Sequence, residues 1–120
     1  MGYYTEFDLD MMPWPCEDKE REIKANIIAR IDNIDISKVE DSDIRWFLSS
    51  EMKWYDHKED MLEVSKMFPD IMFILHGEGE DHDDLWYEYY CNGETERVEA
   101  ELVYPKPKNP KFARAAEGVY

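Results

Sequence analysis

Residues 71–104, IMFILHGEGEDHDDLWYEYYCNGETERVEAELVY, decide the fold because they hold three strand signals in succession. Five consecutive apolar residues, 71–75, are typical of a strand that is covered on both faces and lies centrally in a sheet. Residues 85–91 alternate, and Asn92-Gly93 is the strongest short hairpin signal, since a type I′ turn needs positive φ at both central positions. The returning strand is expected over 95–104. Three adjacent antiparallel strands are therefore predicted.

The upstream half of the chain predicts helices. Isoleucines at positions 23, 27, 31 and 34 recur every three or four residues among charged residues, which indicates an amphipathic helix with one buried stripe. Asp56, followed three residues later by Glu59, is typical of a capping box, and Pro69 ends the helix that follows. The expected elements before the three strands are a strand over 3–9, a helix over 17–32, an irregular segment or short helix over 35–51, a short strand over 53–55 and a helix over 56–67.

This order predicts an α+β fold: a mostly antiparallel sheet of four to five strands with two helices on one face, ferredoxin-like or a variant of it. A length of 120 residues fits one domain, and the aromatic side chains can fill a core without a metal or disulfide. We expect that domain over 1–104 and a Pro- and Lys-bearing tail over 105–120. Cys16 and Cys91 form no CxxC pair and are expected to be reduced, packed thiols.

The charge of the chain narrows the classes of partner. A formal net charge of −15 argues against direct binding to DNA, RNA or anionic lipid, because that affinity comes from clusters of Lys and Arg. A basic partner is favoured instead. No stretch approaches the roughly 18–20 apolar residues that span a bilayer, and the first ten residues carry three acids and no base, unlike a secretory leader. We expect a cytoplasmic protein without membrane contact.

Negative charge is concentrated in the C-terminal strands. From Glu78 to Tyr104 there are ten acids against one base, Arg97, which gives −9 of the total −15. Glu88, Glu99 and Glu101 share a strand face, where alternate residues lie about 6.6 Å apart and neighbouring strands about 4.8 Å apart, a pitch that roughly imitates a phosphate backbone. The candidate partner-binding residues are Glu78, Glu80, Asp81, Asp83, Asp84, Trp86, Glu88, Tyr90, Glu99 and Glu101.

Trp86 and Tyr90 share the parity of Glu88, and two interpretations of that face stay open. If the face is exposed, the aromatic rings provide interface anchors beside the glutamates. If a helix or the tail covers it, both rings belong to the core and the glutamates only edge a buried surface.

No catalytic or metal-binding motif is recognised in the sequence. The acidic stretch 78–84 lacks the ligand spacing of an EF-hand, and no HExxH or GxSxG motif occurs. Gly77 and Gly79 lie among acids that would repel a phosphate. We expect no catalytic residue, no cofactor and no metal site. A site for a hard cation such as Ca²⁺ or Mg²⁺ would have to use the acidic stretch, and a separate transition-metal site would have to be assembled by the fold from His57, His76, His82, Cys16 and Cys91.

One group of proteins shows a similar order of motifs over about residues 53–94. Trp54, the helix end SKMFPD, the strand IMFILH, GEGE, DLW and NG follow one another. This pattern resembles uncharacterised small acidic proteins encoded by phages and prophages. The resemblance brings no activity or site residues, but it implies a phage setting in which small acidic proteins bind and block host proteins.

Charge and resemblance together lead to one main expectation about function. We expect a non-enzymatic, anti-CRISPR-like inhibitor in the cytoplasm of an infected or lysogenic bacterium, which occupies a basic, nucleic-acid-binding surface of a host defence protein. One alternative is a regulatory or assembly module that pairs with a basic partner protein. Another is a small metal-dependent hydrolase that uses the acidic stretch. A homodimer is also possible if the first strand or the strand ending at Tyr104 is an exposed sheet edge.

Overall fold

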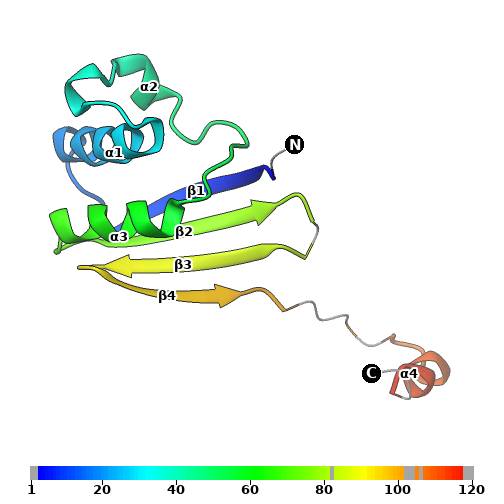
Figure 1. Cartoon of the computed structure of the whole chain (residues 1–120). Coiled ribbons are helices and arrows are strands. Elements are labelled where there is room, and N and C mark those ends of the chain that lie inside the picture. Colours follow the sequence, from blue (N-terminus) through cyan, green and yellow to red (C-terminus); the bar gives the residue numbers. More distant parts are fainter. Residues whose placement is uncertain (1–2, 82, 102–104, 106, 118–120) are drawn as a thin grey trace.

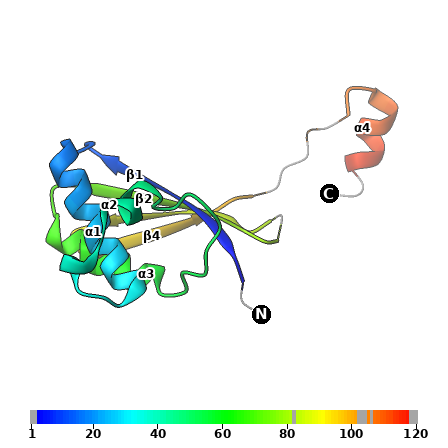
Figure 2. The ribbon, with the colours of Figure 1, turned by 90° about the horizontal axis from the view of Figure 1, so that it is seen from above.

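The computed structural model describes residues 3–81, 83–101, 105 and 107–117. Four strands form one antiparallel sheet in the order β1-β2-β3-β4, so each strand pairs with the next one along the chain. The helices between β1 and β2 lie on one face of this sheet, whereas the helix near the C-terminus lies apart from it (Figure 1; Figure 2). The predicted α+β class is confirmed. The elements are β1 (Thr5–Met12), α1 (Glu17–Asp32), the 3₁₀ helix η1 (Ile36–Lys38), α2 (Asp41–Arg45), α3 (His57–Met67), β2 (Met72–Gly79), β3 (Leu85–Cys91), β4 (Glu94–Glu99) and α4 (Pro110–Glu117).

The core lies between the sheet and the helices α1 and α3. Strands turn alternate side chains toward the helices, and each helix buries the stripe that recurs every three or four residues. Burying one such apolar side chain contributes roughly 1.5–3 kcal/mol. The core side chains are Phe7 and Met11 from β1, Phe73 and Leu75 from β2, Trp86 and Tyr90 from β3, Ile23 and Ile27 from α1, and Met61 and Val64 from α3.

Helix α1 has the bounds that the isoleucine spacing predicts. Ile23 and Ile27 are 0% exposed, whereas Ile34 lies beyond the helix end. The first turn is acidic, which suits the positive end of the helix dipole. The helix ends at Asn33, which adopts a left-handed conformation (φ 53°) and donates its backbone N–H to the carbonyls of Ala29 and Arg30.

The hairpin between β3 and β4 has the predicted turn. Asn92 and Gly93 both have positive φ, 45° and 82°. The N–H of Gly93 also donates to Ser65 Oγ of α3 at 2.9 Å, so the turn is fastened to the helix layer. Asn92 and Gly93 therefore form the turn and, through it, set the pairing register of β3 with β4.

Several local predictions are wrong. Residues 53–55 form no strand, and Met52 makes only a single bridge to Thr5. Asp56 makes no side-chain capping bond at the start of α3. The sequence predicts that the last strand continues to residue 104, but β4 ends at Glu99 and residues 100–101 form no strand; residues 102–104 lie outside the described residues, so that part of the prediction is not tested.

Strand β2 also runs further than predicted, because its glycines pair with β1 instead of turning. Gly77 lies opposite Phe7 in the sheet. A Cβ atom at Gly77 would come within 2.1 Å of the Trp86 indole, so the missing side chain makes room for that ring.

The two cysteines are unpaired, as expected. Cys91 is half-buried, but Cys16 is exposed, so the expectation of a packed thiol is wrong for Cys16. None of the described helices has both the length and the apolar character that a bilayer span requires.

Candidate functional site

The even-numbered side chains of β3 face helix α3. Trp86, Glu88 and Tyr90 are only 4%, 3% and 1% exposed. The prediction that these three residues form an exposed binding row is therefore wrong, because α3 lies over this face of β3. The alternative in which a helix covers Trp86 and Tyr90 is correct.

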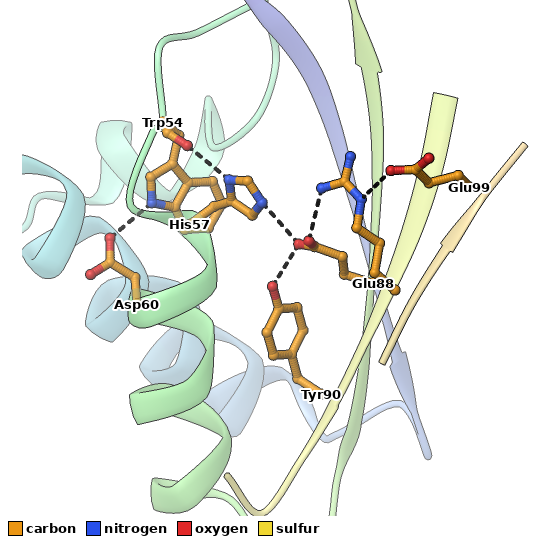
Figure 3. A network of polar contacts seen from close by, with 7 residues as sticks. Trp54, His57, Asp60, Glu88, Tyr90 and Glu99 are labelled. Carbon is orange, nitrogen blue, oxygen red and sulfur yellow. Dashed lines mark hydrogen bonds and ion pairs between the residues drawn. The ribbon is translucent and has the colours of Figure 1, made fainter. Parts of the chain in front are cut away.

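Glu88 is the centre of a buried polar network (Figure 3). Its Oε1 accepts a hydrogen bond from the Tyr90 hydroxyl at 2.6 Å and lies 2.9 Å from His57 Nε2. Its Oε2 accepts from Arg97 Nη1 at 3.1 Å. Arg97 also donates to Glu99 at 3.2 Å and lies over the Trp86 ring. Arg97 therefore partly neutralises two of the three glutamates in the predicted anionic row.

The contacts of His57 define its protonation state. Nδ1 lies 3.0 Å from the carbonyl oxygen of Trp54, which can only accept, so Nδ1 carries a proton. A neutral ring would then point the lone pair of Nε2 at the Glu88 carboxylate without a hydrogen bond. A second proton on Nε2 makes this contact an ion pair. We conclude that His57 is an imidazolium beside an ionised Glu88.

The shifts in pKa agree with this assignment. Burial alone would lower the pKa of His57, but the hydrogen bond and charge of Glu88 outweigh burial and raise it above 6.5. Burial alone would raise the pKa of Glu88, but hydrogen bonds from His57 and Tyr90 lower it below 4.5. Burial, and then the bond to Glu88, raises the pKa of Tyr90. The network is an ion pair with a neutral phenol.

A second buried carboxylate fastens the segment before α3. Asp60 accepts a hydrogen bond from the Trp54 indole at 2.8 Å (Figure 3). It also accepts one from Arg30 of α1 at 3.3 Å. Trp54, the first residue of the motif series noted above, therefore has a structural role in joining α1, α3 and the preceding loop.

The acidic stretch also has structural partners. Asp84 accepts from the Tyr3 hydroxyl at 2.6 Å, and Glu80 accepts from the Tyr4 N–H at 2.9 Å. These bonds hold the start of the chain against the β2–β3 connection. Within the described residues, which do not include His82, no three His, Cys, Asp or Glu side chains are grouped so as to hold a metal ion. The other predicted residues of this group, Glu78, Asp81, Asp83 and also Glu101, are exposed.

A cavity of about 300 Å³ lies between α1 and the segment 42–52. Its walls include Ile28, Phe47 and Leu48, and Leu48 has an unusual positive φ of 57°. The polar side chains on this wall are two carboxylates, three hydroxyls and the indole of Trp46. None of its lining residues belongs to the four strands.

The opposite face of the sheet is not covered by any described helix (Figure 2). We call it the open face. Its centre is aromatic and apolar: Tyr87 lies between His76 and Val98 in the register, and Tyr87 and Val98 are 46% and 47% exposed. The open face consists of Glu6, Asp8, Asp10 and Met12 from β1, Met72, Ile74, His76 and Glu78 from β2, Leu85, Tyr87, Tyr89 and Cys91 from β3, and Glu94, Glu96 and Val98 from β4.

Carboxylates flank this centre on both sides. Three come from β1, one from β2 and two from β4, and all of them are exposed. Arg97 is the one arginine within the four strands, which contain no lysine, and it faces the helices. The β1 and β4 rows lie three strand spacings apart, about 14 Å. The open face is therefore an anionic surface with an apolar centre.

Sequence reasoning included Glu78 among the candidates, as part of an acidic loop, but missed the carboxylates of β4 and β1 on this face. The signal for those of β1 is the alternation in TEFDLDMM, where Phe7 and Met11 are buried while Glu6, Asp8 and Asp10 are exposed. This alternation is clearer than that of β3, where both faces carry aromatic rings.

Comparison with models of protein families, with curated proteins and with solved structures finds no match.

Proposed function

We propose that this chain is a non-enzymatic binding protein that places its open face on a basic surface of a partner protein. One observation carries the proposal: six exposed carboxylates surround an uncovered aromatic centre, with no lysine or arginine on that face of the described strands. Carboxylates at this density attract cationic surfaces and speed association, while Tyr87 and Val98 offer apolar contact once water is excluded.

The partner that we propose is a host defence protein with a nucleic-acid-binding surface, such as a CRISPR effector. Support comes from the resemblance to small acidic phage proteins and from the arrangement of charge. In this mechanism the open-face carboxylates take the positions of phosphates at Lys and Arg side chains, so nucleic acid is excluded by competition. The Glu88 network keeps β3 and α3 in place behind this surface.

The test is protection of a phage in a bacterium that carries an active CRISPR system. We expect the chain to restore plaque formation and the variant D8K/E78K/E96K, altered on three strands of the open face, to lose this effect. The matched control E22K/D32K/E63K changes net charge equally on α1 and α3 and should keep the effect. Equal behaviour of both variants would contradict the role of the open face.

A binding measurement with purified CRISPR effector separates competition from other mechanisms. We expect association to slow at least tenfold between 10 and 150 mM salt, because the screening length falls from about 30 Å to about 8 Å. Bound effector should also lose its affinity for DNA. Binding that is insensitive to salt, or a ternary complex with DNA, would contradict the proposal. Binding only to a basic protein from the chain's own genome would favour the regulatory or assembly alternative.

A further inference from the structure

Helix α4 is a short basic helix without a partner in the described structure. It contains Lys111, Phe112 and Arg114 and follows Lys108. Phe112 is 58% exposed, and within the described residues no hydrogen bond or ion pair joins α4 to the other elements. Isolated helices shorter than about 12–15 residues are marginal in water, so an eight-residue helix needs a surface to pack against.

The open face has the dimensions and charge for such a helix. The two rows of carboxylates are about 14 Å apart, and a helix with its side chains is about 10–12 Å wide. Lys111 lies about 100° around the helix from Phe112, on its flank, whereas Arg114 lies about 160° from Phe112, on the far side of the helix. A helix that places Phe112 on Tyr87 and Val98 would therefore direct Lys111 toward one row of carboxylates and turn Arg114 toward solvent.

The connection between the sheet and α4 is long enough for this docking. Ten residues, 100–109, separate the end of β4 from the start of α4 and can extend over at most about 33–36 Å. The sheet is about 14 Å across, and its seven-residue strand β3 is about 23 Å long. Every part of the open face lies within reach of the same chain.

We propose that α4 docks in cis on the open face, with Phe112 against Tyr87 and Val98, and occupies that face until a basic partner displaces it. The displacement step rests on the proposed function; the docking itself rests only on the complementarity of the two surfaces. The tail is then a competitor built into the chain, and its high local concentration means that a partner must bind more tightly than α4.

Paramagnetic broadening in the full chain tests the docking. A spin label is attached at N109C in a C16S/C91S background, and amide signals are recorded. We expect signals of Tyr87, Tyr89 and Val98 to broaden while those of α1 do not, and the effect to disappear at 0.5 M salt. Absence of broadening on the open face, or broadening spread equally over α1, would overturn the proposal.

Two further experiments show which segment occupies the open face. The variant K108E/K111E/R114E should lose the broadening, whereas K19E/K38E/R45E, with the same change of charge on the helix layer, should keep it. In a mixture of spin-labelled unenriched chain with unlabelled ¹⁵N-enriched chain, we expect no broadening. Broadening in that mixture would identify a second copy as the occupant and overturn docking in cis.

The docking of α4 and the proposed function can be contradicted independently of each other. Effector binding by both the wild-type chain and K108E/K111E/R114E, without broadening, would overturn the docking and leave the proposed function standing. Broadening without effector binding by either chain would support the docking and contradict the proposed function. If both proposals hold, K108E/K111E/R114E should bind the effector more tightly than the wild-type chain does. This gain in affinity should exceed any gain shown by the control K19E/K38E/R45E, which has the same change of charge.

Discussion

The two faces of the sheet both carry carboxylates, but in opposite environments. Glu88 on the helix-covered face is 3% exposed and is bonded to Tyr90 and Arg97 and paired with His57. Asp8 on the open face is exposed and has no ion-pair partner among the described residues. A buried carboxylate is tolerated only when its bonds are satisfied, whereas an exposed one stays available to another molecule. The charge of Glu88 therefore belongs to the fold, whereas that of Asp8 is available for the recognition that we propose.

The sharpest test of this difference is to remove the buried carboxylate. We expect Glu88→Ala to lower the free energy of unfolding by about 2–4 kcal/mol, because it leaves the charges of His57 and Arg97 without their partner. Urea unfolding measures the change. The matched control Glu99→Ala removes an exposed partner of Arg97 and should cost less than about 1 kcal/mol. Equal losses in the two variants would show that burial does not distinguish them.

The glycine beneath Trp86 should give the next largest effect. We expect Gly77→Ala to lower the free energy of unfolding by about 1–3 kcal/mol, because the new Cβ meets a ring that is buried and cannot withdraw. Gly79→Ala is the control, since its Cβ would meet the ends of Asp84 and Tyr3, which can move. Thermal or urea unfolding compares them, and a larger loss at Gly79 would contradict the packing described for the covered face.

The protonation of His57 predicts how stability depends on pH. Its pKa is raised in the folded chain, so the stabilisation is complete below the unfolded value of 6.5 and is lost as pH rises through the folded value. Glu88 has a lowered pKa, so its contribution is present above 4.5 and is lost as pH falls through its folded value. The free energy of unfolding, measured from pH 6 upward, should therefore decline.

Substitutions of histidine identify the source of that decline. His57→Gln should flatten the profile above pH 6.5, while His76→Gln, a change on the open face, should leave its slope unaltered. A decline of the same slope in His57→Gln would mean that another group is responsible.

The smallest effect on stability is expected from the open face. D8K/E78K/E96K should change the free energy of unfolding by no more than about 0.5 kcal/mol, since these side chains are exposed and unpaired within the described residues. Urea unfolding at 0.1 M salt measures it, with E22K/D32K/E63K as the comparison. A loss of several kcal/mol would mean that the open face belongs to the core of the structure.

The sequence predicted the local elements well where their signals depend on neighbouring residues. The isoleucine spacing predicted α1 to its end residues, and alternation and Asn92-Gly93 predicted β3 and its turn. The sequence did not show which face of the sheet the helices cover, because alternation shows which side chains share a face but not which face a helix covers. In β3 both faces carry aromatic side chains, whereas in β1 one face carries the apolar Phe7 and the other face carries the charged Asp8.

Strand β4 is the part of the sheet that depends least on apolar burial, since all six of its side chains are exposed. In addition to the backbone ladder, β4 is held beside β3 by the turn fastened to Ser65 and by the contacts of Arg97 with Glu88 and with the Trp86 ring. Local opening should therefore begin at this edge, well below the cost of global unfolding. Because the segment leading to α4 starts where β4 ends, each such opening would also lengthen the tether of the basic tail.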